Sequence, residues 1–153
     1  MKRNKAEAPS FDSKRAWISS PTPEPSKLLA AIVDFLPKES FLYVEGTVID
    51  SQASALYCRN ACSPVRKIVP DTIQPPPRSF HMPATVKVLT QLSTFMKANP
   101  SAKWGHHLKI YSAEGILVDW HDADTDWPVF LSSRFSKKSA EELGRILGCT
   151  FTR

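Results

Sequence analysis

The chain of 153 residues lacks the motifs that identify many enzyme classes. It contains only five glycines, and the phosphate-binding patterns G-x-x-x-x-G-K-[ST] and G-x-G-x-x-G are both missing. The G-x-S-x-G pattern of serine hydrolases and the H-E-x-x-H pattern of zinc proteases are missing as well. None of these motifs therefore indicates a reaction, and we expect a protein that is not an enzyme.

Cysteines and long apolar runs are also scarce. The three cysteines, Cys58, Cys62 and Cys149, are an odd number, which does not suit a secreted disulfide framework. No stretch approaches the roughly 18 consecutive apolar residues of a membrane-spanning helix. The charged N-terminus MKRNKAEAPSF is not followed by the apolar segment of a signal peptide. These absences predict a cytoplasmic protein with reduced thiols.

The excess of positive charge is small and is concentrated near the N-terminus. The net charge is +5, and residues 1–27 hold six of the basic and three of the acidic residues. The rest of the chain is nearly balanced, which is poor evidence for a nucleic-acid-binding face. We therefore expect a protein partner, with no specific nucleic-acid binding and no membrane binding.

Proline marks a change in organisation along the chain. Residues 1–25 mix charge, serine and proline without periodicity, which predicts a flexible basic leader. The leader also contains three large apolar residues that could anchor part of it onto the domain: Phe11, Trp17 and Ile18. Residues 26–153 are expected to form a single domain, which is an ordinary length for one hydrophobic core.

Periodicity within that domain predicts an α+β fold. Helical stripes indicate three main helices at 26–36, 83–98 and 136–149, with a short helix at 51–62. Alternating or β-branched stretches indicate strands at 40–49, 106–112, 116–122 and 127–133, with one short strand at 65–69. We expect an antiparallel β-meander of about four strands with the three main helices packed on one face.

The hairpin at 106–122 can pair in two registers. With Tyr111 opposite Ile116, each face of the hairpin mixes polar and apolar residues. With a three-residue loop ending at Gly115, Leu108 faces Trp120 on one apolar face, and Lys109 faces Asp119 on the other. We prefer the second register because it separates core from solvent.

The preferred register brings together residues that could bind a metal. His107 lies opposite His121 and beside Asp119 on the polar face of the sheet. Two imidazoles and a carboxylate are ligands that zinc and similar divalent ions accept. Glu45, the one acid in a strongly apolar strand, is a fourth candidate. No other cofactor is indicated.

An acidic segment begins in the second strand of the hairpin and continues into the loop beyond it. The stretch VDWHDADTDW alternates carboxylates between two tryptophans. An EF-hand is excluded, because the glycine and glutamate positions of such a loop hold Trp127 and Ser133. Aromatic rings supply contact area and acids steer toward a basic partner. The residues expected to bind a partner are Trp120, Asp122, Asp124, Asp126 and Trp127.

These patterns lead to two functional hypotheses. The favoured one is a small, non-catalytic protein-binding domain, of the kind that acts as an inhibitor or immunity protein against a cationic toxin or nuclease. This analogy rests on composition alone. The alternative is a metal-dependent, hydrolase-like enzyme that uses His107, His121 and Asp119, with Glu45 nearby.

Overall fold

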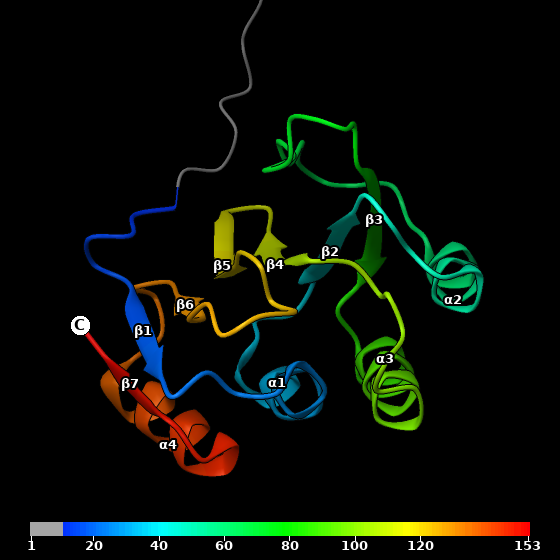
Figure 1. The fold of residues 1–153 in the computed structure, drawn as a ribbon. Coiled ribbons are helices and arrows are strands. Elements are labelled where there is room, and N and C mark those ends of the chain that lie inside the picture. The colour runs from blue at the N-terminus through cyan, green and yellow to red at the C-terminus, as the bar shows by residue number, and fades with distance from the viewer. Residues whose placement is uncertain (1–10) are drawn as a thin grey trace, which may run out of the picture.

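The computed structural model describes residues 11–153, which form an open antiparallel sheet of seven strands with four α-helices (Figure 1). The strand order is β3-β2-β4-β5-β6-β1-β7, and every neighbouring pair is antiparallel. The strands are β1 (Trp17–Ser20), β2 (Phe41–Gly46), β3 (Arg78–Pro83), β4 (His107–Ser112), β5 (Gly115–Trp120), β6 (Phe130–Leu131) and β7 (Thr150–Thr152). The helices are α1 (Pro25–Ile32), α2 (Ser51–Asn60), α3 (Val86–Ala98) and α4 (Lys137–Leu147), with a short 3₁₀ turn at Val33–Phe35.

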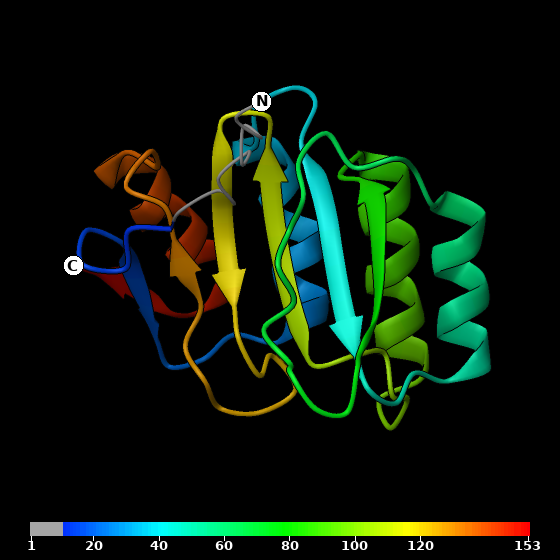
Figure 2. The same cartoon turned by 90° about the horizontal axis from the view of Figure 1, so that it is seen from above.

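The helices lie as a layer on one side of the sheet. Figures 1 and 2 show α1, α3 and α4 beneath the sheet, while α2 lies beside the edge strand β3. The α+β class, the antiparallel sheet and the three helices on one face are thus confirmed. The expected strand count was too low, because three strands were not recognised. Within residues 11–153, no helix is long and apolar enough to cross a bilayer.

The unrecognised strands lie where the sequence signal is weak. Strand β1 falls in the expected leader, where buried Trp17 donates its indole N–H to the carbonyl of Phe135 at 2.9 Å. Strand β3 follows directly after a run of prolines, and β7 has only three residues. Strands of three or four residues, such as β7 and β1, are too short to show a periodicity, and the prolines before β3 favour a loop. Conversely, no strand forms at 65–69, and the expected strand at 127–133 is reduced to β6.

The helix boundaries agree well with the sequence signals. Helix α3 begins after Thr85, whose hydroxyl accepts from the backbone N–H of Val88 at 3.3 Å. Helix α4 begins after Ser136, which caps the N–H of Ser139, and ends at Gly148 in the left-handed conformation. The short helix expected at 51–62 forms as α2 over 51–60.

The hairpin of β4 and β5 contains both of the registers considered above. Leu108 pairs with Trp120 and Ile110 with Val118, as the preferred register requires. Nearer the turn, Tyr111 pairs with Ile116, because a bulge shifts the register after Ile110. The bulge accommodates one extra residue on β5 and allows a tight turn without exposing the apolar side chains.

The two faces of the sheet have different coverings. The helix-covered face holds the main core, including Leu42, Val44, Leu108 and Trp120. On the opposite face, the segment 62–77 runs across β2 and β4 (Figure 2). A small second cluster of Tyr43, Tyr111 and Ile68 packs between this segment and the sheet. This second face also carries the buried polar side chains of Glu45, His107 and Lys109.

Candidate functional site

Glu45 is fully buried on β2 and fastens the covering segment to the sheet. One carboxylate oxygen accepts from the backbone N–H of Asp71 at 2.9 Å, and the other accepts from that of Thr72 at 3.2 Å. The hydroxyl of Tyr43 donates to the same carboxylate at 3.3 Å. Glu45 is therefore occupied by the chain's own donors, and it is not among the grouped metal-ligand candidates.

Lys109 on β4 is the cation at the centre of this polar face. Its buried ammonium lies 2.9 Å from Oδ2 of Asp71 and 2.8 Å from Oδ1 of Asp119. Burial alone lowers the pKa of Lys109, but Asp119 and Asp71 outweigh it, so the pKa lies above the usual value. Burial raises the pKa of Asp71, but the bond to Lys109 outweighs it, and the pKa is lowered. Lys109 thus joins the hairpin to the covering segment.

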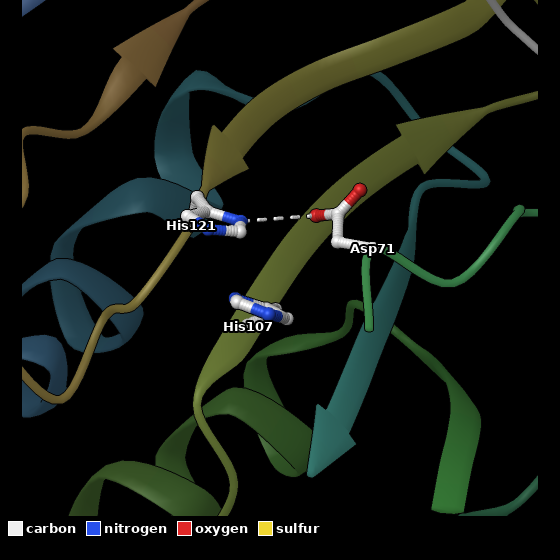
Figure 3. Close-up of side chains that lie close together, drawn as sticks. All are labelled: Asp71, His107 and His121. Carbon is white, nitrogen blue, oxygen red and sulfur yellow. Dashed lines mark ion pairs between the residues drawn. The ribbon is translucent and has the colours of Figure 1, made fainter. Parts of the chain in front are cut away.

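His107 and His121 lie against each other at the end of the hairpin. Their rings are stacked, with centroids 4.1 Å apart and planes 15° from parallel. Nδ1 of His121 is 3.6 Å from Oδ2 of Asp71 (Figure 3). Nε2 of His121 faces Oδ2 of Asp122 at 3.3 Å. His121 is therefore bracketed by two carboxylates.

His107 is almost fully buried and has a different role. Its Nδ1 accepts a hydrogen bond from the backbone N–H of Asp122 at 2.9 Å. Burial lowers the pKa of His107, and the neighbouring charge of His121 lowers it further. An accepting Nδ1 requires the neutral ring with its proton on Nε2. His107 therefore positions Asp122, at the point where the acidic segment leaves the hairpin.

Asp71, His107 and His121 form the group whose residue types suit a metal ion. One ligand atom from each lies within 4.8 Å of the others (Figure 3). The expected ligand Asp119 is not part of this group, and its Oδ1 lies 2.8 Å from the ammonium of Lys109. Asp71, which the sequence analysis did not select, takes its place. The only sequence signal for Asp71 was that it is the sole carboxylate between residues 51 and 105.

Three features of this group do not fit a bound ion in the described conformation. Stacked, nearly parallel rings point their in-plane lone pairs in directions that do not converge on one ion. Nδ1 of His107 is already used as an acceptor, and the ammonium of Lys109 already neutralises Asp71. The cluster is organised as a hydrogen-bond and ion-pair network, and metal binding would require it to rearrange.

The acidic segment divides into an inner and an outer part. Trp120 is fully buried and Asp122 is half-buried against the two histidines. Asp124 and Asp126 are exposed, and neither forms an ion pair within residues 11–153. Trp127 is 51% exposed. Of the five residues expected to bind a partner, only these last three are exposed.

Hydrogen bonds to the body of the protein brace the acidic segment at both ends. The indole N–H of Trp120 donates to the carbonyl of Trp127 at 2.9 Å, and Thr22 donates to the carbonyl of Asp126 at 2.7 Å. The N–H of Ala123 donates to the carbonyl of His106 at 2.7 Å. Asp122 adopts a left-handed conformation with φ 48°, which turns the chain sharply after β5. The segment is therefore fixed in shape.

A cleft of about 650 Å³ adjoins this segment. Its walls are the segments 22–25, 100–105 and 123–126, which come from distant parts of the sequence. Glu24, Asp124 and Asp126 contribute carboxylates to these walls, while Lys103 is the one cation among them. The cleft continues the negative surface away from Trp127.

Comparison with known proteins adds no relative: no family model, no curated protein and no solved structure matches this chain.

Proposed function

We propose that the protein is a non-catalytic binding domain that holds a basic protein partner through Asp124, Asp126 and Trp127. The observation that carries this proposal is the combination of two unpaired exposed carboxylates with a half-exposed indole on a braced loop. Trp120 and Asp122 support the loop from within and are not contacts in this proposal.

Bracing matters because it reduces the entropy lost when a partner binds. Ordering a flexible side chain or loop costs about 0.5–1.5 kcal/mol per immobilised side chain. Here the chain's own hydrogen bonds already fix the loop through Trp120, Thr22 and His107. In protein–protein interfaces, a tryptophan often contributes much of the binding energy, and polar or charged residues surround it. Trp127 with its neighbouring carboxylates has this composition.

The partner should present lysine or arginine around an apolar site that receives the indole. Such a surface occurs where a protein handles anionic substrates, as in a toxin or nuclease, and we therefore propose an inhibitor or immunity role. The carboxylates would raise the association rate, and salt should reduce it.

The test is affinity capture from the native host with the full chain as bait, comparing wild type with D124N/D126N/W127A. A matched control, E141Q/E142Q, changes two exposed carboxylates on α4. We expect a protein retained by wild type and control, released by high salt, and lost with the triple variant. Equal retention by all three baits would overturn the proposal.

A second candidate, a metal-dependent hydrolase, is favoured by one observation: the grouping of Asp71, His107 and His121. The side chain of His121 is half-exposed and could rotate away from the stacked ring of His107. Metal binding would use this rearranged cluster. Titration with zinc, monitored by calorimetry, tests it. Binding with a 1:1 stoichiometry that is lost in H121Q would favour this candidate, and absence of heat up to millimolar zinc would eliminate it.

A further inference from the structure

Charge is unevenly distributed between two stretches of the described chain. Residues 51–105 carry seven cations and a single carboxylate, Asp71, which Lys109 holds. Residues 106–133 carry five carboxylates and only one cation. The first stretch forms α2, the covering segment, β3 and α3 at the β3 end of the sheet (Figures 1 and 2), and its last residues, 99–105, lead to the cleft beside the acidic segment. We call this end the basic end.

The cations of the basic end are free to meet an external anion. None of them forms an ion pair with a carboxylate within residues 11–153. Six of the seven are classed as exposed and the seventh is half-buried. They are Arg59, Arg66, Lys67, Arg78, Lys87, Lys97 and Lys103.

A groove of about 610 Å³ runs between α2 and α3 at this end. One wall is the stripe Gln52, Ala55, Leu56 and Arg59, and the other is Thr90, Gln91, Thr94 and Phe95. Residues three or four apart share one face of a helix, so Lys87 continues the α3 wall one turn before Gln91. Lys87 and Lys97 are ten residues apart, or about 15 Å along the helix.

We propose that this groove binds a single nucleic-acid strand without sequence preference, with Arg59, Lys87 and Lys97 contacting phosphates. Cationic grooves that also offer an aromatic face and neutral hydrogen-bonding side chains suit a strand whose bases are unpaired. Phe95 supplies the ring, and Gln52, Thr90 and Thr94 supply amide and hydroxyl groups. The surface is separate from the acidic segment, so the inference does not depend on the proposed protein partner.

The lining favours a nucleic acid over an acidic protein. A stable protein interface needs an apolar centre of large side chains that lose contact with water. Phe95 and Leu56 are the only large apolar side chains in the groove, and both are already partly covered. Half of the lining residues are glutamines and threonines, which can hydrogen-bond to bases and sugars.

The test uses the full chain and a fluorescent 20-nucleotide single-stranded DNA of mixed sequence, followed by anisotropy. The test variant is R59Q/K87Q/K97Q. The control variant, K38Q/K138Q/R145Q, removes the same charge from exposed positions outside the basic end. Both retain the basic N-terminus, and circular dichroism checks that both fold.

We expect wild type and control to bind alike at 50 mM salt and the test variant to bind roughly tenfold more weakly or worse. Loss of three phosphate contacts should also reduce the salt slope of log K by about 2. If the test and control variants lose the same amount of DNA affinity, binding depends on net charge or on the N-terminal tail, and the proposal is wrong. Absence of binding by wild type, or competition by poly-glutamate as effective as that by unlabelled DNA, would overturn it as well.

Discussion

The acidic segment and the basic end differ in how their charges are used. At the acidic segment and the sheet face beside it, Asp71, Asp119 and Asp122 lie against Lys109 and the two histidines, and only Asp124 and Asp126 remain free. At the basic end, every cation is unpaired within the described chain. The comparison shows that charges inside a network hold the fold together, whereas unpaired charges are available for binding. The following predictions test this distinction, and the largest effects should come from the network.

Replacing the central cation should have the largest effect on stability. In K109M, two carboxylates that are each less than a third exposed lose their shared partner. Breaking a buried pair from one side costs about 3–5 kcal/mol, and we expect about 3 because both acids retain some solvent. Urea denaturation measures the loss. The control K87M removes an exposed, unpaired cation and should change stability by less than about 0.5 kcal/mol. Equal losses in the two variants would contradict the comparison.

The next largest effect is expected for E45Q. The N–H groups of Asp71 and Thr72 donate to different oxygens of Glu45, so glutamine in the same position turns a donor NH2 group toward one of them. A lost hydrogen bond to a charged acceptor costs about 1.5–3 kcal/mol. Hydrogen exchange should show faster exchange of these two amides, with α2 and α3 unaffected. Unchanged protection at Asp71 and Thr72 would show that Glu45 does not fasten the segment.

Lowering the pH should weaken the fold through its buried histidines. The pKa of His107 and that of His81 are both lowered by burial in the folded state. The unfolded chain then binds more protons below about pH 6.5, so stability is present above that pH and is lost as the pH falls toward the folded pKa values. We expect the free energy of unfolding to fall less between pH 7.5 and 5.5 in H107N than in wild type. The asparagine oxygen in this variant can still accept from the N–H of Asp122. A loss identical to wild type would assign the effect to His81 or to other groups.

The smallest effects should come from the free carboxylates. D124N and D126N remove charges that have no partner within residues 11–153, so we expect each to change the unfolding free energy by less than about 0.5 kcal/mol. The same substitutions should reduce partner capture. A loss of stability above 1 kcal/mol in thermal or urea unfolding would show that these charges belong to the network after all.

Much of the fold was predictable because its larger elements have strong local signals. The stripe of α3, the capping of α4 by Ser136 and its end at Gly148 are all local features. The pairing of Leu108 with Trp120 followed from separating apolar from polar residues. Strands β1 and β7 were missed because such short strands depend on their neighbours more than on their own residues, and β3 because prolines precede it.

The candidate site was only partly predictable. The stacking partner of His107 followed from the register, and so did the pairing of Lys109 with Asp119. The participation of Asp71 did not, because a proline-rich loop has no periodicity that places it over the sheet. The mean charge of the body also concealed the basic end, since an average over the chain contains no information about position.

The sequence by itself determined the class of fold, the main helices and the central hairpin, since periodicity and capping act between residues close in the chain. Only the tertiary structure decided which charges neutralise one another. It placed Asp71 on Lys109, engaged His107 with the backbone of Asp122, and left the cations of α2 and α3 unpaired. The physical reason is that electrostatic pairing depends on distance and burial in space, which residues far apart in sequence acquire only when the chain folds.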